Sequence, residues 1–154
     1  MFSQWVCAIL SIAKYIDNRR DFSIPLATKV KEVVGLDLQR AAIRSGARNA
    51  ETAEISNCTF LQKSAVDGIK DMAEAGEVFD LLLLDPPRRG CREVLPYLEG
   101  IGSPAVIYIS CDPATLARDI KDMSELGYIL KKVQLVDMFP QTHHIETVVL
   151  LEKK

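Results

Sequence analysis

Two nearly continuous apolar runs, at 78–84 and 105–110, constrain the fold of this chain more than any other feature. A strand with one face in water alternates apolar and polar residues, whereas these runs leave no polar face. Strands buried on both faces are typical of parallel sheets that carry helices on each side. Each run ends at a proline-containing turn, 85–87 after the first and 111–113 after the second. The runs therefore predict the centre of an α/β sheet.

Strand-like and helix-like segments alternate from residue 29 onward. Apolar runs bounded by turn residues predict strands at 31–37, 58–61, 78–84 and 105–110. The segments between them predict helices at 38–54, 65–75, 91–100 and 112–126. Two final strands, 128–136 and 146–151, are joined by a link too short for a crossover helix, so antiparallel pairing is expected. The prediction is a mostly parallel, Rossmann-like sheet with a C-terminal antiparallel hairpin and helices on both faces.

Composition excludes several classes of protein. The chain has 154 residues, 48% of them hydrophobic, and a formal net charge of −2, which indicates one folded domain rather than disorder or a strongly basic nucleic-acid binder. Its four cysteines form no CxxC pair, so neither a zinc site nor a disulfide framework is expected, and a cytoplasmic location is predicted. No apolar segment approaches the length of a membrane span, and the apolar start lacks the basic n-region of a signal peptide.

Cys111 is the sharpest candidate for chemistry. It follows a predicted buried strand and directly precedes the start of a helix at Asp112-Pro113. The unpaired N–H groups and the dipole at a helix N-terminus favour a thiolate. The alternative is a buried structural cysteine, which is common in proteins.

Three further candidates end predicted strands or follow them. Asp37 could accept hydrogen bonds from the ribose hydroxyls of a nucleoside cofactor, or it could cap the next helix. Asp85 begins a rigid turn in which Pro86 removes a backbone donor and leaves carbonyls free to face a ligand. Arg88 could contact phosphate or be a solvated surface arginine. In parallel sheets such strand ends share one edge, where ligands bind.

Glu146 stands at the entrance to the last predicted strand, where a carboxylate could act as a general base or simply face solvent. The preceding pair His143 and His144 suggests a metal, but no third ligand lies nearby in the sequence, so no metal site is predicted. A cysteine hydrolase would need one of these histidines as the base for Cys111, which is the weakest of the functional hypotheses.

Three segments carry a family resemblance: 85–90 (DPPRRG), 108–119 (YISCDPATLARD) and 137–149 (DMFPQTHHIETVV). In this order they resemble the RNA (uracil-5-)methyltransferase family, whose members use S-adenosyl-L-methionine to methylate C5 of uridine in ribosomal or transfer RNA. The resemblance runs from about Phe22 to the C-terminus. It implies a class I methyltransferase sheet, S-adenosyl-L-methionine as cofactor and RNA as partner.

The resemblance also implies a role for each candidate. Cys111 matches the nucleophile of the family's SCNP motif, and Glu146 matches the base of its H-x-E-(S/T)-V motif. Asp37 matches the acidic residue that binds the cofactor ribose. Asp85 matches the aspartate of the DP(A/P)R motif at the cofactor and uracil pocket, with Pro86 beside it at the cofactor and Arg88 at the substrate.

The chain departs from the family at its N-terminus. The family has a strand and a glycine-rich cofactor loop before the position of Phe22, whereas residues 16–21 contain no glycine. We therefore divide the chain into a non-family segment, 1–21, and an incomplete catalytic domain, 22–154. Cofactor and RNA binding are expected to be weak, and an inactive remnant that binds neither productively is the alternative to an active enzyme.

The missing strand would occupy the centre of the sheet, and an empty slot would leave buried backbone groups unpaired at about 1–3 kcal/mol each. The only spare apolar segment is 4–12, which has strand-forming residues but also apolar positions at helical spacing. We predict a strand that fills the slot. The alternative is a helix packed outside the sheet, with the gap closed by direct pairing of the two flanking strands or by a second chain.

Overall fold

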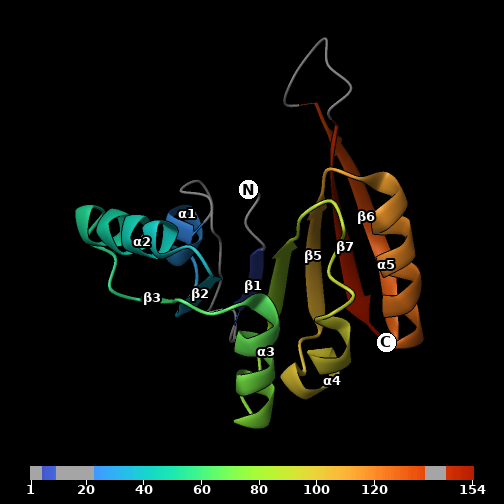
Figure 1. The fold of residues 1–154 in the computed structure, drawn as a ribbon, viewed down its shortest axis with the longest axis horizontal. Helices are drawn as coiled ribbons and strands as arrows, with labels where there is room; N and C mark the ends of the chain where they lie inside the picture. Colours follow the sequence, from blue (N-terminus) through green and yellow to red (C-terminus); the bar gives the residue numbers. More distant parts are fainter. Residues whose placement is uncertain (1–4, 10–22, 138–144) are drawn as a thin grey trace.

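A single seven-stranded sheet in the order β3-β2-β1-β4-β5-β7-β6 forms the framework (Figure 1). The computed structural model describes residues 5–9, 23–137 and 145–154. The strands are β1 (Trp5–Ile9), β2 (Val33–Asp37), β3 (Cys58–Leu61), β4 (Leu81–Asp85), β5 (Ala105–Ser110), β6 (Tyr128–Val136) and β7 (Glu146–Lys153). Both β1 and β7 run antiparallel to their two neighbours, so β2, β3, β4, β5 and β6 all point the same way. The mostly parallel sheet and its antiparallel C-terminal pair are thereby confirmed.

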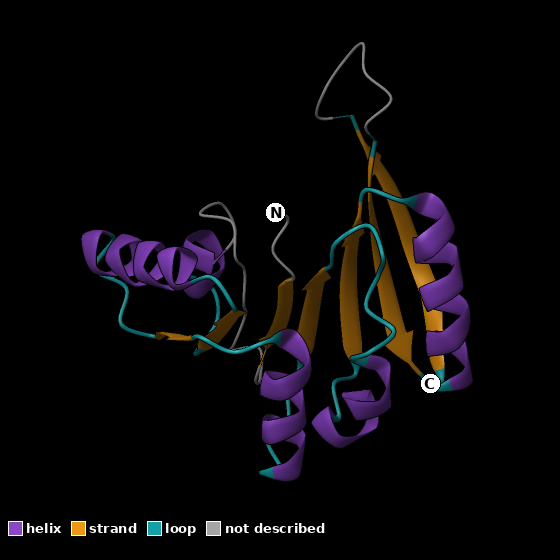
Figure 2. Cartoon of the chain, in the orientation of Figure 1, coloured by secondary structure: helices purple, strands orange, loops and turns teal. Residues whose placement is uncertain are grey.

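Helices cover the sheet in two groups (Figures 1 and 2). They are α1 (Ser23–Ala27), α2 (Arg40–Thr52), α3 (Ala65–Glu74), α4 (Leu98–Ile101) and α5 (Pro113–Glu125), with a 3-10 turn at Leu95–Tyr97. Gly35 of β2 faces the Phe60 ring, which also lies against Gly46 of α2, whereas the next residue, Leu36, packs under Gly68 of α3. Because neighbouring residues of a strand point to opposite faces, α2 and α3 lie on opposite sides of the sheet.

The N-terminal strand fills the central slot, as predicted. Residues 5–8 pair with β2 and residues 5–9 pair with β4, so β1 occupies the slot between these two strands. The strand runs antiparallel to both, although the family resemblance implies a strand parallel to its neighbours. Its first residue, Trp5, therefore lies at the edge where β2 and β4 end, and Ile9 lies at the opposite edge.

Two sequence predictions were wrong in detail. The segment 91–100 is not one helix, because Cys91 to Val94 form turns and Pro96 sits in a 3-10 turn before α4. The strand β5 is not fully buried on both faces. Val106, Tyr108 and Ser110 are buried on the α5 side, whereas the residues between them are only half-buried. On the face of the sheet opposite α5, the described helices α1 and α2 lie by β2 and β3 and do not cover β5 (Figure 1).

Candidate functional site

Asp37 and Asp85 lie in one row at the carboxyl edge of the sheet. Each is the last residue of its strand, and each is the register partner of Trp5 in the strand between them. Strands lie about 4.8 Å apart, so the two aspartates are separated by about 10 Å across the sheet. Partners in one row point to the same face, so the two carboxylates flank one stretch of that edge.

Cys111 and Glu146 meet at the same edge through the β5–β7 ladder. The last register pair of that ladder is Ser110 with Thr147, both of them buried. The next residues outward are Cys111, which follows β5, and Glu146, which begins β7. Opposed residues on antiparallel strands have Cβ atoms about 5 Å apart. The fold therefore places these two candidates across from one another, both half-buried.

All four candidates are on the same face of the sheet. Tyr108 points to the α5 side, where its hydroxyl bonds Asp119, and Leu84 is its partner on β4. Alternation then puts Asp85 and Cys111 on the opposite face. Asp37 shares that face, because Gly35, two residues before it, lies toward Phe60 and α2. One edge and one face of the sheet thus gather a thiol and three carboxylates.

Asp37 is buried, at 2% exposure, and only half of its carboxylate is satisfied. Its Oδ1 accepts a hydrogen bond from the backbone N–H of Gln39. Its Oδ2 has no partner among the residues that the structure describes. The helix-cap alternative is wrong, because Gln39, not Asp37, occupies the N-cap position of α2. A buried, unpaired carboxylate oxygen fits a ligand that brings hydroxyl donors, as the ribose of a nucleoside cofactor does.

Burial raises the pKa of Asp37 from 3.8 to about 6, partly offset by the Gln39 bond. The folded chain therefore holds this proton more tightly than the unfolded chain, and its stability falls as pH rises from about 4 to about 6. We expect Asp37→Asn to remove that loss, which reaches at most about 3 kcal/mol. Urea unfolding of both proteins at several pH values measures it. Equal pH profiles for the variant and the wild type would contradict the burial of an ionisable Asp37.

The turn that follows β4 brings Arg88 toward the start of α5. Asp112 is the N-cap of that helix, as predicted, and its Oδ1 accepts the Thr115 N–H at 2.9 Å. These cap hydrogen bonds lower the pKa of Asp112, and the charge of Arg88 contributes in the same direction. The negative charge beside Cys111 is thus partly offset by an arginine of the Asp85–Arg88 turn.

Sequence reasoning missed a cluster under this turn. Asp119 of α5 is fully buried, and its carboxylate accepts hydrogen bonds from the Cys91 N–H, the Tyr108 hydroxyl and the Arg118 guanidinium. Gly90 adopts φ +83°, and a Cβ there would lie 2.2 Å from Asp119 Oδ2. The signal was an aspartate on the inward side of an amphipathic helix, one turn from Leu116.

Some predictions fall outside the described residues: the histidine pair His143 and His144, and the glycine-free segment 16–21. Within the described ranges, no group of three or more His, Cys, Asp or Glu side chains could hold a metal ion. No helix in those ranges is both long and apolar enough to cross a membrane.

The fold and the strand-edge site define a class I, Rossmann-like methyltransferase domain. A crystal structure of the Pyrococcus abyssi tRNA (uracil-54, C5)-methyltransferase with S-adenosyl-L-homocysteine is similar to it, with a TM-score of 0.73 and 30% identity. That similarity covers 92% of this chain and 34% of the other. The sequence model of the tRNA (Uracil-5-)-methyltransferase family matches residues 12–154. The chain belongs to this family.

Curated relatives agree with the family. An uncharacterized RNA methyltransferase of Geobacter sulfurreducens is 44% identical over 130 residues, which are 84% of this chain and 26% of that protein. The 23S rRNA (uracil(1939)-C(5))-methyltransferase RlmD of Klebsiella pneumoniae is 38% identical over 134 residues, 87% of this chain and 31% of that protein. The chain thus spans about a third or less of the relatives it matches.

Proposed function

We propose that this chain transfers a methyl group from S-adenosyl-L-methionine to C5 of uridine in RNA. The observation that carries the proposal is the register of β5 and β7, which sets Cys111 opposite Glu146 at the ligand-binding edge. A thiol and a carboxylate on one face are the two groups that this reaction requires from the protein. Membership of the family and the ribosomal and transfer RNA activities named for its relatives support the choice of reaction.

Carbon C5 of uracil is a poor nucleophile, so the protein must activate it. The Cys111 thiolate adds to C6 and forms a C–S bond, which moves the electron pair of the C5–C6 double bond toward C5. Bound S-adenosyl-L-methionine supplies the methyl group to that carbon. Glu146 then removes the proton from C5, the double bond re-forms, and the thiolate leaves from C6.

The cofactor would lie along the row of Asp37 and Asp85. Asp37 Oδ2 offers an unpaired acceptor to the ribose hydroxyls. Asp85 and Pro86 would border the methyl-transfer end, since they lie on the side of the row nearer to Cys111. The target uridine must be unstacked from its RNA strand to enter a site of this kind. An enzyme that modifies RNA in this way would work in the cytoplasm.

Cofactor binding by this chain is expected to be weak, in the high micromolar range or above, or about −5.5 kcal/mol at best. A glycine-rich loop must follow a strand that ends beside Asp37 and Asp85, whereas β1 begins there and ends at the far edge. Calorimetric titration with S-adenosyl-L-homocysteine measures the affinity. A dissociation constant in the low micromolar range would contradict this expectation.

RNA containing 5-fluorouridine tests the proposed function. Fluorine at C5 cannot leave as a proton does, so the thioether at C6 is trapped after methyl transfer. We expect a covalent protein–RNA species that forms with millimolar S-adenosyl-L-methionine. A chain that forms no such species with any uridine-rich RNA would refute the proposal.

A further inference from the structure

One fully buried carboxylate holds the loop that follows β4. Asp119 Oδ2 accepts the backbone N–H of Cys91 at 2.8 Å and the Tyr108 hydroxyl at 2.7 Å. Its Oδ1 accepts the Arg118 Nε at 2.9 Å and the Arg118 Nη2 at 2.6 Å. The strand β5 and the loop that follows β4 are thereby fastened to one side chain of α5.

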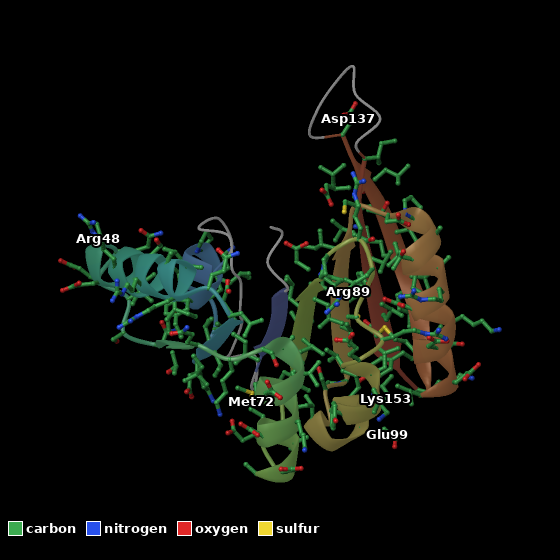
Figure 3. The ribbon with its side chains drawn as sticks, in the orientation of Figure 1. Arg48, Met72, Arg89, Glu99, Asp137 and Lys153 are labelled. Carbon is green, nitrogen blue, oxygen red and sulfur yellow. The ribbon has the colours of Figure 1, made fainter. Side chains whose placement is uncertain are left out.

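Arg118 extends this hold to a second point of the loop. Its Nη2 also donates to the main-chain carbonyl of Arg89 at 2.7 Å. Figure 3 labels Arg89 on the loop that follows β4. The carbonyl of Arg89 and the N–H of Cys91 flank Gly90, whose positive φ lets the main chain lie directly against the carboxylate. The bonds therefore fix main-chain groups of the loop.

Stability alone is a weak reason for this arrangement. Burying an ion pair costs desolvation, and well-packed apolar side chains often stabilise a core as much or more. A carboxylate that bonds loop main chain instead fixes position, because each hydrogen bond requires a narrow range of distance and angle. The loop begins at Asp85 and carries Arg88, so what is fixed here adjoins the proposed reaction site.

The helix α5, which carries Arg118 and Asp119, also begins at the proposed reaction site. Cys111 and Asp112 directly precede α5, and Asp119 lies seven residues after Asp112, about 10 Å along the helix axis. One rigid element thus carries the proposed nucleophile at its start and the loop anchor two turns later. Because β4 and β5 are parallel neighbours, the loop that carries Arg88 leaves β4 at the same edge of the sheet where Cys111 follows β5.

We propose that Arg118 and Asp119 are positioning residues that hold the 86–91 loop so that Arg88 lies beside Asp112 and Cys111, next to the base entering from RNA. This inference rests on the proposed function. The arginine there balances the charge of Asp112 and offers a guanidinium to the oxygen atoms of the uridine or its phosphate.

The test compares two variants that each remove part of the network. Arg118→Gln keeps a donor for Asp119 but loses the second donor that reaches Arg89. Tyr108→Phe removes the hydroxyl that bonds the same carboxylate and contacts the Cys91 thiol, but it leaves the two main-chain bonds of the loop, at the Cys91 N–H and the Arg89 carbonyl, in place, so it is the matched control. Adduct formation with 5-fluorouridine RNA is followed at saturating RNA and cofactor, together with thermal unfolding and cofactor affinity.

We expect Arg118→Gln to lower the maximal adduct rate tenfold or more, with cofactor affinity changed less than twofold. Tyr108→Phe should lose stability while keeping a rate within threefold of the wild type. Arg118→Lys, which restores a charged donor, should recover part of the rate. Equal rates in all variants, or losses that simply follow the unfolding temperature, would overturn the positioning role.

Hydrogen exchange of the loop amides tests whether Arg118 and Asp119 fix the 86–91 loop, independently of any reaction. Arg118→Gln should speed exchange at Gly90 and Cys91 tenfold or more, and leave amides of β4 and β5 unchanged. An unchanged loop overturns the proposal even if the enzyme is active. A wild-type chain that shows loop protection but forms no adduct would refute the proposed function and, with it, the role of Arg118 and Asp119 in catalysis. The exchange rates would still show whether Arg118 and Asp119 fix the loop.

Discussion

Cys111→Ala is expected to abolish both methyl transfer and the covalent adduct with 5-fluorouridine RNA. Without a nucleophile at C6, uracil C5 lacks the electron density to accept a methyl group, so the loss should be complete rather than partial. The adduct is measured as a protein–RNA band that survives denaturation. The fold should persist, because Cys111 lies outside β5 and is only partly buried.

Cys58→Ala is the matched control. Cys58 is also a half-buried cysteine, but it begins β3, at the opposite side of the sheet from β5. This variant should form the adduct at the wild-type rate. An adduct that persists in Cys111→Ala and disappears in Cys58→Ala would show that the nucleophile has been assigned to the wrong residue.

Glu146→Gln is expected to stop the reaction one step later. The thiolate still adds to C6 and C5 still receives the methyl group, but no base removes the C5 proton. With ordinary uridine RNA, the variant should therefore accumulate a methylated covalent complex that the wild type resolves quickly. The expected loss in turnover is about 10²–10⁴-fold, the usual contribution of a general base.

Glu152→Gln makes the same substitution on the same strand and face, six residues away, where Glu152 forms an ion pair with Lys131. It should release product normally. Normal turnover in Glu146→Gln, with no accumulated complex, would remove Glu146 from the mechanism and leave the proton to another group.

The sequence predicted strand bounds best where turn residues stand at both ends of the strand. The bounds of 58–61, 105–110 and 128–136 match the structure to the residue, and Asp112 is the helix cap that its Asp-Pro pair indicates. The central slot was predicted from the hydrogen-bond demand of the two strands beside it. That demand is equally met by a strand of either direction, which is why the antiparallel course of β1 could not be foreseen.

The site could be predicted only in part, for a similar reason. Residues at strand ends converge because parallel strands share an edge, so Asp37 and Asp85 follow from the pattern. The pairing of Cys111 with Glu146 depends on β7 lying between β5 and β6, a register that no local signal encodes. The Asp119 anchor depends on contacts between residues 28 positions apart, such as the bond to Cys91, which only the folded chain brings together.

Transfer of an isotopically labelled methyl group from S-adenosyl-L-methionine to RNA is the decisive test of the proposed reaction. The chain is incubated with millimolar labelled cofactor and a uridine-rich RNA, the RNA is digested, and its nucleosides are separated by chromatography and identified by mass and by comparison with a 5-methyluridine standard. Labelled 5-methyluridine is expected from the wild type and should be absent with Cys111→Ala. No labelled nucleoside, or a label on a base other than uracil, would contradict it.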